Sequence, residues 1–539
     1  METDPFKYGR LPLPFACGFY DGKTYFQTWG DSCVTEMLEF LKGYAQPLVI
    51  FAHNGGKFDF WYLSHAIAEP VLFIESRLVR ATLYHHEIRD SFKILPVALA
   101  QINKDEIDYR KMERSRRDKY REEISRYLKS DCVYLYNAVE RFVMEFGDVL
   151  TIGAAALKEL RKDYKIEHIT AAQDLVYREF FHGGRCECFE GGELKGRGPW
   201  KLYDVNSMYP FAMAEYQHPV GAADYVCSDI PDAPFYLAHI CARSKGALPL
   251  RTKEGLKFPH GHFEFKVTSH ELRMALQLKL VEITQVIECH AWNDVRSFDK
   301  FVYRFDKAKI AAEKRGDKTG RTFNKLIENN GYGKLTTDPR RFKEFKLYDS
   351  VTECEAAGYK VDGELGERII GALPVEPKPR QFYNVAAGAS VTGAGRSILM
   401  HAIACAERPV YGDTDSLWCQ SLPLVLDQQK LGAWKLETEA DTLYIAGKKL
   451  YAAHKGSAAR TNRHAWENGF YSDPRRSPRG KGNTKPLKCA SKGVRMKPED
   501  IARVALGEII TVPQDAPSLR VGREAKFIAR DIARRVKEG

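Results

Sequence analysis

Two short acidic segments, far apart in the chain, constrain the fold most strongly. "YDVNSMYP" places Asp204 at the end of an apolar strand and Tyr209 at the close of a turn, and "VYGDTDSLW" places Asp413 and Asp415 between strand-like flanks. Residues i and i+2 of a strand point to the same side, so these two carboxylates repel each other unless a cation lies against them. Either segment alone is equally well explained as an acidic surface turn. Together they offer carboxylates from two separated strands, the arrangement that holds two divalent ions about 4 Å apart.

Length and charge favour a multidomain protein with a polyanionic partner. The 539 residues are too many for one core, and about two to four domains are expected. Lys and Arg total 82 against 71 acidic residues, a net charge of +11 that leans toward nucleic acid. The excess is modest for a chain of this length, so it supports nucleic acid as a partner without establishing it.

The cysteines and the apolar runs indicate the compartment. The twelve cysteines include no C-x-x-C pair, which speaks against a zinc site and fits a reducing environment. The opening "METDPFKYGR" is polar, unlike a secretion signal, and no apolar run has the length of a transmembrane helix. We therefore expect a soluble cytoplasmic protein with no membrane partner.

A basic helix between the acidic segments offers groups that suit a nucleotide. In "GRTFNKLIENNGYGKL", Arg321, Lys325, Asn329 and Tyr332 are spaced four, four and three residues apart, which places them on one helical face. The cations suit phosphates, and the ring suits a base. A solvated basic helix is the simpler alternative, but it does not explain the asparagine or the "GYGK" ending. The preceding "RGDKTGRT" does not satisfy G-x-x-x-x-G-K-[ST], so a phosphate-binding loop is excluded there.

These segments resemble the motifs of family B DNA polymerases, in the family order. Residues 204–210 look like motif A (D-x-x-S-x-Y-P), residues 325–333 like motif B (K-x-x-x-N-S-x-Y-G), and "YGDTDS" like motif C (Y-x-D-T-D-S). "FHGGR", "TGAGR" and "KLY" are similar to the Y-x-G-G, T-x-x-G-R and K-x-Y motifs of the protein-primed branch, used by phages with terminal proteins. "ETDPFK" and "AHNGGKFDF" look most like tectiviral phage polymerases, and the resemblance covers nearly the whole chain.

The resemblance implies a role for each of these residues. Asp204 and Asp415 are expected as the main ligands, and Asp413 as a supporting ligand, of two Mg²⁺ or Mn²⁺ ions. Tyr209 is expected to lie under the sugar and exclude a 2′-hydroxyl. Asn330 and Phe181 depart from the family's Ser and Tyr, which affects fine tuning rather than the reaction. The residues expected to contact dNTP are Tyr209, Lys309, Arg321, Lys325 (also catalytic), Asn329 and Tyr332, and those expected to contact DNA are Asn54, Phe58, Ser91, Tyr109, Gly183, Gly184, Thr392, Arg396, Lys449 and Tyr451.

Two N-terminal segments resemble exonuclease motifs of the same family. "HNGGKFD" offers Asp59 and "YLKSD" offers Asp131 as metal ligands, with Tyr127 one helical turn before Asp131 to position water. Lys104 is expected as a further catalytic residue. The family's first motif is D-x-E, and "METDPF" supplies only Glu2, since the aspartate would fall one position before the first residue. We therefore predict a truncated nuclease domain with a fraying N-terminus and weak or absent 3′–5′ activity.

The implied fold is a multidomain α+β and α/β architecture. An RNase H-like 3′–5′ exonuclease domain, truncated at its N-terminus, would precede a right-hand polymerase of palm, fingers and thumb with two insertions. "RKMERSRRDKYREEISRYLKSDCVYLYNAVERFVMEF" is expected as one long helical stretch, and "SDPRRSPRGKGNTKPLK" as a mobile loop. The expected ranges are 1–150 for the exonuclease domain, 151–210 for the first part of the palm, 211–300 for the first insertion (terminal-protein region 1), 301–335 for the fingers, 336–388 for the second insertion (terminal-protein region 2), 389–445 for the palm with motif C and 446–539 for the thumb and tail.

The resemblance implies a DNA-directed DNA polymerase that replicates a linear phage-type genome by protein-primed initiation and strand displacement. Its partners would be template and primer DNA, dNTPs and a terminal protein; a single-stranded DNA-binding protein is compatible with this role. The compartment would be the host-cell cytoplasm if a phage encodes the chain. Two alternatives stay open: a primase-like family B polymerase that starts without a protein primer, and a catalytically inactive DNA-binding or packaging protein. Primer extension with Mg²⁺ would exclude the inactive DNA-binding protein. A first nucleotide covalently linked to a protein would exclude the primase-like polymerase.

Overall fold

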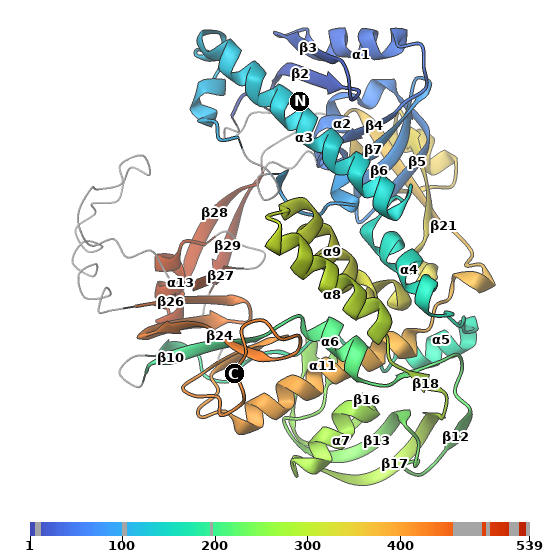
Figure 1. Ribbon diagram of the computed structural model, residues 1–539, viewed down its shortest axis with the longest axis vertical. Helices are drawn as coiled ribbons and strands as arrows, with labels where there is room; N and C mark the ends of the chain where they lie inside the picture. Colours follow the sequence, from blue (N-terminus) through green and yellow to red (C-terminus); the bar gives the residue numbers. More distant parts are fainter. Residues whose placement is uncertain are drawn as a thin grey trace. The chain divides into compact units, whose positions relative to one another are not determined.

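The computed structural model describes residues 1–5, 12–99, 105–194, 198–455, 488–491, 496–516 and 528–534. The chain forms two compact units (Figure 1). Predictions on Lys104 and on the basic loop after residue 471 fall on positions outside the described residues, apart from Lys488. The first unit contains residues 1–165, 303–382 and 515–529, and the second contains residues 166–302, 383–514 and 530–539.

A seven-stranded sheet forms the centre of the first unit, in the order β20-β21-β19-β5-β6-β7-β4. β4 pairs with β7 in parallel, and the other pairings are antiparallel. A second, three-stranded sheet has the order β1-β2-β3. The strands are β1 Glu2–Thr3, β2 Pro14–Tyr20, β3 Tyr25–Trp29, β4 Val49–Ala52, β5 Ile67–Ile74, β6 Arg77–Leu83, β7 His86–Asp90, β19 Lys343–Tyr348, β20 Lys360–Leu365 and β21 Arg368–Pro374.

The strands of the second predicted insertion belong to this larger sheet. β19 pairs with β5 at Phe345 and Val71, and the rings of Phe345 and Phe73 are 5.3 Å apart. Leu347 and Ile370 are buried in the same apolar core as Phe73. Residues 343–374 therefore share a core with the nuclease-like part of the chain, although they are far from it in sequence.

One predicted helix of the first unit begins later than expected. The long helix α3 begins at Arg121, because residues 109–112 and 117–120 form separate 3₁₀ turns. Asp108 starts the first turn by accepting the backbone N–H of Arg110, and Arg117 pairs with Asp31 instead of continuing a helix. The prediction of one continuous helix was therefore wrong at its N-terminal end. The helices are α1 Cys33–Gly43, α2 Asp59–Tyr62, α3 Arg121–Phe146, α4 Ile152–Asp163, α8 Asp299–Lys314 (mainly in this unit), α9 Lys318–Asn330 and α10 Val351–Ala356.

The second unit is built around a five-stranded sheet in the order β24-β10-β23-β22-β8, which we call the palm sheet. Trp200, Leu202 and Trp418 lie in one apolar cluster of this sheet, and Tyr203 and Leu417 lie in another. The strands are β8 Cys186–Cys188, β10 Trp200–Val205, β22 Tyr411–Asp413, β23 Ser416–Cys419 and β24 Trp434–Ala440.

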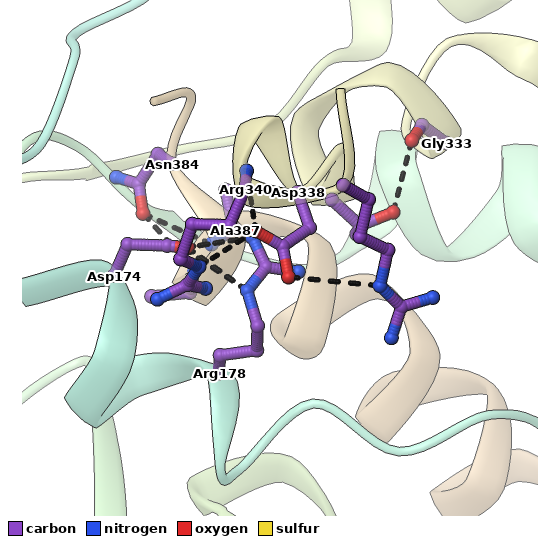
Figure 2. A network of polar contacts seen from close by, with 10 residues as sticks. Asp174, Arg178, Gly333, Asp338, Arg340, Asn384 and Ala387 are labelled. Atoms are coloured by element: carbon purple, nitrogen blue, oxygen red, sulfur yellow. Dashed lines mark hydrogen bonds and ion pairs between the residues drawn. The ribbon is translucent and has the colours of Figure 1, made fainter. Parts of the chain in front are cut away.

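Two helices pack against one apolar cluster of the palm sheet. α6 covers Met208–Glu215, so Tyr209 and Pro210 begin a helix instead of closing a turn as predicted. Proline is tolerated there because the first helical turn needs no backbone N–H donor. α11 covers Val385–Cys405 and crosses the predicted boundary at residue 388; Asn384 caps it by accepting the N–H groups of Ala386 and Ala387 (Figure 2).

The first predicted insertion forms its own sheet within the second unit, in the order β12-β17-β13-β16, with α7 packed against it (Figure 1). A further four-stranded sheet has the order β27-β26-β25-β9. No helix in the described ranges is long and apolar enough to span a membrane. The remaining elements are α5 Ala171–Arg178, β9 Gly192–Leu194, β11 His218–Pro219, β12 Tyr225–Cys227, β13 Phe235–Lys245, β14 Leu250–Thr252, β15 Gly255–Lys257, β16 His260–Thr268, α7 Ser269–Gln277, β17 Val281–Trp292, β18 Val295–Arg296, β25 Thr442–Gly447, β26 Leu450–His454, β27 Lys488–Ser491, α13 Pro498–Ala505, β28 Ile510–Ala516 and β29 Ile528–Arg534.

Candidate active sites

The register of three neighbouring strands brings the acidic residues of the palm sheet together. Asp204 on β10 lies opposite Ser416 on β23, and Asp413 on β22 lies opposite the same Ser416. Asp415 directly precedes Ser416, in the tight turn where Thr414 has a φ of 63°. The backbone carbonyl of Asp415 accepts the N–H of Val205 at 2.8 Å, which ties this turn to β10. Two distant segments thus place three carboxylates around one strand position.

Lysines neutralise two of these carboxylates. Lys435 Nζ lies 3.1 Å from Asp204 Oδ1, and Lys449 Nζ lies 2.7 Å from Asp413 Oδ2. Burial, and next the charge of Asp204, raises the pKa of Asp415 to about 6. Burial also raises the pKa of Asp204, against the opposing effect of Lys435. Sequence reasoning missed Lys435, because its pairing depends on the β10–β24 register, in which Asp204 and Lys435 are opposite each other.

The donor set suits a divalent cation. In the described part of the chain, no three His, Cys, Asp or Glu side chains already form a metal-binding group. The oxygens of Asp204, Asp413 and Asp415 are nevertheless the ligand type that Mg²⁺ and Mn²⁺ prefer. A nearby cation would also favour the ionised form of carboxylates whose pKa is raised by burial. These three residues therefore supply the donor chemistry of a divalent-metal site, although in this structure lysines occupy two of the carboxylates.

Tyr209 lies between two glycines from different segments. A Cβ added at Gly184 would be 2.9 Å from Tyr209 Oη and 2.8 Å from Thr414 Cγ2. A Cβ added at Gly395, on α11, would be 3.1 Å from Tyr209 Cε1. All three distances are shorter than an ordinary carbon contact of about 3.5–4.0 Å. Glycine at these positions therefore allows the close approach to the ring.

Four of the residues predicted to contact DNA are buried in this structure. Ser91 is bonded to His53 in the first unit, and Tyr451 packs against Tyr411. Thr392 Oγ1 donates to a carbonyl of its own helix. Arg396 is 2% exposed, and its guanidinium is bonded inside the protein. Among the remaining predicted contacts, Asn54, Tyr109 and Gly183 are exposed, and Phe58, Gly184 and Lys449 are partly exposed.

Glu271, which sequence reasoning also missed, pairs with Arg396. Arg396 Nε lies 2.6 Å from Glu271 Oε2, and both side chains are buried. Arg396 Nη1 donates to the carbonyls of His182 and Gly183 at 2.6 and 2.9 Å. Glu271 belongs to α7 of the first insertion and has no family motif around it. A buried glutamate that belongs to no motif gives no sequence signal.

The predicted nucleotide-binding residues lie on α8, α9 and the following turn. Arg321 and Lys325 are exposed on α9, and Arg321 pairs with Glu313 at 3.3 Å. Asn329 Nδ2 donates to the carbonyl of Lys325 at 2.7 Å, so its amide lies along the helix. Tyr332 follows α9 and is partly buried. These residues belong to the first unit, whereas the three aspartates belong to the second.

Lys309 is already paired within the first unit. Its Nζ lies 2.7 Å from Asp306 on α8 and 2.9 Å from Glu328 on α9. Desolvation opposes its charge, but the two carboxylates raise the pKa of Lys309 overall. Lys309 therefore links α8 to α9 through its ion pair with Glu328, in addition to its predicted contact with a nucleotide.

The predicted nuclease carboxylates also lie near one another. Burial raises the pKa of Glu2 to about 7; the N-terminal ammonium opposes this shift, and the charges of Asp131 and Asp59 add to it. The amino nitrogen of Met1 lies 3.2 Å from Asp59 Oδ1. Glu2 of β1 is paired with Ala16 of β2, whereas the sequence suggested an end that frays. Strand pairing and the ion pair of Met1 hold this end.

Two tyrosines and an asparagine complete this cluster. Tyr127 Oη lies 3.3 Å from Tyr109 Oη, and burial raises the pKa of Tyr127 well above its usual range. Burial likewise raises the pKa of Asp131. Asn54 accepts a hydrogen bond from Arg77 at 2.8 Å, which fixes its amide beside the turn after β4.

Comparison with known proteins agrees with this arrangement. Residues 101–360 match the family model of DNA polymerase type B, organellar and viral. The chain is 38% identical over 542 residues to the DNA-directed DNA polymerase of Enterobacteria phage PRD1, covering 99% of this chain and 96% of that one. It is 25% identical over 407 residues to the DNA polymerase of Bacillus phage Nf, covering 68% and 67% of the two chains.

A solved structure supports the fold. The structure of phi29 DNA polymerase complexed with primer-template DNA and incoming nucleotide substrates is similar, with a TM-score of 0.72. The identity is 17%, over 98% of both chains. A binary complex of phi29 DNA polymerase with primer-template DNA gives a TM-score of 0.71 at 18% identity, also over 98% of both chains. With the relative of phage PRD1 matched over nearly its whole length, the chain belongs to the family B DNA polymerases of the organellar and viral type and is a DNA-directed DNA polymerase.

Proposed function

We propose that this polymerase works by two-metal nucleotidyl transfer at Asp204, Asp413 and Asp415. The observation that carries the proposal is the strand register that gathers these carboxylates around Ser416. Asp204 and Asp415 would be the main ligands of Mg²⁺ or Mn²⁺, and Asp413 a supporting one. Bound there, two divalent ions would lower the pKa of the primer hydroxyl and neutralise triphosphate charge during in-line displacement.

Manganese binding tests the metal site without relying on activity. Electron paramagnetic resonance of Mn²⁺ added to the metal-free protein counts the bound ions in the wild type and in Asp204→Ala/Asp415→Ala. The double variant should bind fewer ions at the same free concentration, because its two main ligands are gone. A matched variant, Asp427→Ala, removes an exposed carboxylate that accepts backbone N–H groups in its own turn. Equal Mn²⁺ binding by all three proteins would remove the site assignment.

The basic face of α9 would bind the nucleotide. Lys325 and Arg321 would neutralise the phosphates, as would Lys309 if it leaves its present carboxylate partners, and Tyr332 and Asn329 would line the base-pair pocket. Tyr209 would exclude ribonucleotides by its bulk. The ternary complex of phi29 DNA polymerase, which has the same fold, contains primer-template DNA and incoming nucleotides, and we propose the same two kinds of partner here.

We also propose protein-primed initiation on a linear phage-type genome, followed by strand displacement. The four-stranded sheet of residues 225–292 is too large for a simple connection after motif A, which supports a role in holding a partner. Incubation with a candidate terminal protein and labelled dNTP should give a labelled band of that protein's mass after denaturing electrophoresis. Efficient initiation on origin DNA alone would favour the primase-like alternative. A single-stranded DNA-binding protein would act during displacement.

The first unit supports a second activity, 3′–5′ exonuclease. The proximity of Glu2, Asp59 and Asp131 is the observation in its favour, and Tyr127 would position the attacking water. Degradation of labelled single-stranded DNA measures this activity. Asp131→Ala should abolish whatever digestion the wild type shows and leave primer extension intact. Digestion that persists in this variant would exclude the assigned cluster.

A further inference from the structure

The ring of Tyr209 is enclosed by two chain segments that are distant in sequence. One is the linker of residues 182–185, whose Gly184 approaches Tyr209 Oη. The other is α11, whose Gly395 approaches the ring carbon Cε1. Because neither segment has a side chain at the point of approach, the position of the ring depends on the spacing between the two backbones.

Arg396 fixes that spacing. It follows Gly395 on α11, and its Nη1 donates to the carbonyls of His182 and Gly183 at 2.6 and 2.9 Å. The guanidinium thus joins the two segments directly beside the residues that touch the ring. The linker is also bonded to motif C, since the carbonyl of Arg185 accepts the N–H of Thr414 at 2.6 Å.

Glu271 in turn holds Arg396. The two side chains make a two-pronged pair, with Nε–Oε2 at 2.6 Å and Nη2–Oε1 at 3.1 Å, and almost none of either is exposed. Glu271 Oε1 also accepts the N–H of Thr268 at 2.9 Å, in the capping box that starts α7. A guanidinium held in this way presents its remaining donor to the linker in one orientation.

We propose that Glu271 is a positioning residue for sugar selection, which acts through Arg396 on the two backbones that enclose Tyr209. The proposal rests on the proposed function, in which Tyr209 excludes the 2′-hydroxyl. It extends that function to a residue of the first insertion, on α7, that lies outside the polymerase motifs. Loosening the Glu271–Arg396 pair should widen the space around the ring and admit ribonucleotides more readily.

The test is the ratio of kcat/KM for dNTP to kcat/KM for rNTP in Glu271→Gln. Glutamine keeps the volume and one acceptor but loses the charge. We expect the ratio to fall about three- to tenfold, mainly through a lower KM for rNTP, while kcat for dNTP stays within about twofold. If Glu271 only stabilised the fold, Glu271→Gln would lower the melting temperature and the folded fraction and leave the dNTP-to-rNTP ratio unchanged. An unchanged ratio in folded Glu271→Gln therefore overturns the proposal.

A second variant and a matched control complete the design. Arg396→Lys keeps the positive charge beside Glu271 but cannot serve both the glutamate and the linker carbonyls, so it should lower the ratio in the same way. It decides the question if Glu271→Gln does not fold. The control is Glu159→Gln in the first unit, a buried carboxylate paired with Arg304 at 2.7 Å, which should lose stability without changing the ratio. A fall in the control equal to that in Glu271→Gln also overturns the proposal.

Tyr209→Val separates failure of this inference from failure of the proposed function. If Tyr209→Val lowers the ratio and both Glu271→Gln and Arg396→Lys leave it unchanged, Tyr209 excludes ribonucleotides but Glu271 does not position it. If Tyr209→Val also leaves the ratio unchanged, Tyr209 is not the gate and both claims fall. A fall in all three variants, and not in the control, supports the proposal.

Discussion

Gly184→Ala should damage catalysis far more than the same change at the neighbouring Gly183. The added carbon at position 184 would lie 2.8 Å from both Cγ2 and Oγ1 of Thr414 and 2.9 Å from Tyr209 Oη. An ordinary carbon contact is about 3.5–4.0 Å, so these groups must move by several tenths of an ångström to about 1 Å. Overpacking of this kind costs about 1–3 kcal/mol. If the strain is relieved by displacing Thr414 and Tyr209, kcat/KM for dNTP falls about 5- to 150-fold.

Gly183→Ala is the matched control, since no heavy atom lies within 4 Å of the carbon it would add. The assay is single-nucleotide incorporation at saturating primer-template, with thermal unfolding and the Kd for DNA measured on the same preparations. Gly183→Ala should keep kcat and the melting temperature close to wild type, and any effect should appear in the Kd for DNA. Equal losses of kcat/KM in the two variants would refute the argument from close approach.

Three further outcomes follow from the charges and the caps. Lys435→Met removes the ammonium 3.1 Å from Asp204, so the metal-free protein should bind Mn²⁺ a few-fold more tightly by titration calorimetry; weaker binding would contradict this. The pKa of Asp415 is about 6 and a metal ligand must be ionised, so the Mn²⁺ affinity should be constant above about pH 7 and fall by up to about tenfold per unit below pH 6; a flat profile would argue against this ligand. Asp317→Ala removes the cap that accepts the N–H of Gly320 and the partner of Arg141, which should lower the free energy of unfolding of the first unit by about 1–2 kcal/mol in urea. Unchanged stability would mean that water replaces both contacts.

Local patterns predicted the elements that carry the chemistry. The basic helix α9 and the strands on either side of Asp413–Asp415 were expected from residue spacing and strand-like flanks. The resemblance to the family predicted that Asp204 lies close to Asp413 and Asp415, because the three residues are expected to bind the same metal ions. The strand register in the structure provides the physical basis for that meeting.

Pairings between distant segments could not be predicted. Lys435 and Glu271 lie in stretches without a motif, and their partners depend on cross-strand register and on helix packing that one sequence does not encode locally. The membership of β19 in the nuclease sheet is of the same kind, since a single long-range pairing at Phe345 and Val71 creates it. The internal ion pair of Arg396, which the resemblance predicts as a DNA contact, likewise depends on a partner far away in the sequence.

α3 begins later than predicted because 3₁₀ turns compete with the α-helix in the residues before Arg121. Residues 110–120 have helix-forming side chains, but Asp108 and Asp31 provide hydrogen-bond and ion-pair partners that favour 3₁₀ turns. Aspartate commonly competes with a helix in this way by binding nearby backbone N–H groups. The N-terminal strand is a second case, because its pairing with β2 depends on contacts that its own two residues do not reveal.

The most direct measurement for the polymerase site is single-turnover incorporation by Asp415→Ala on saturating primer-template, with the Kd for DNA measured in parallel. Asp415 lies between β22 and β23, and its carboxylate is close enough to Asp204 for their charges to interact. We expect a loss of rate of about three orders of magnitude or more with the Kd for DNA within about threefold, because lysine and arginine contacts to phosphate hold the DNA. A rate near that of the wild type, or a loss explained by weaker DNA binding alone, would contradict it.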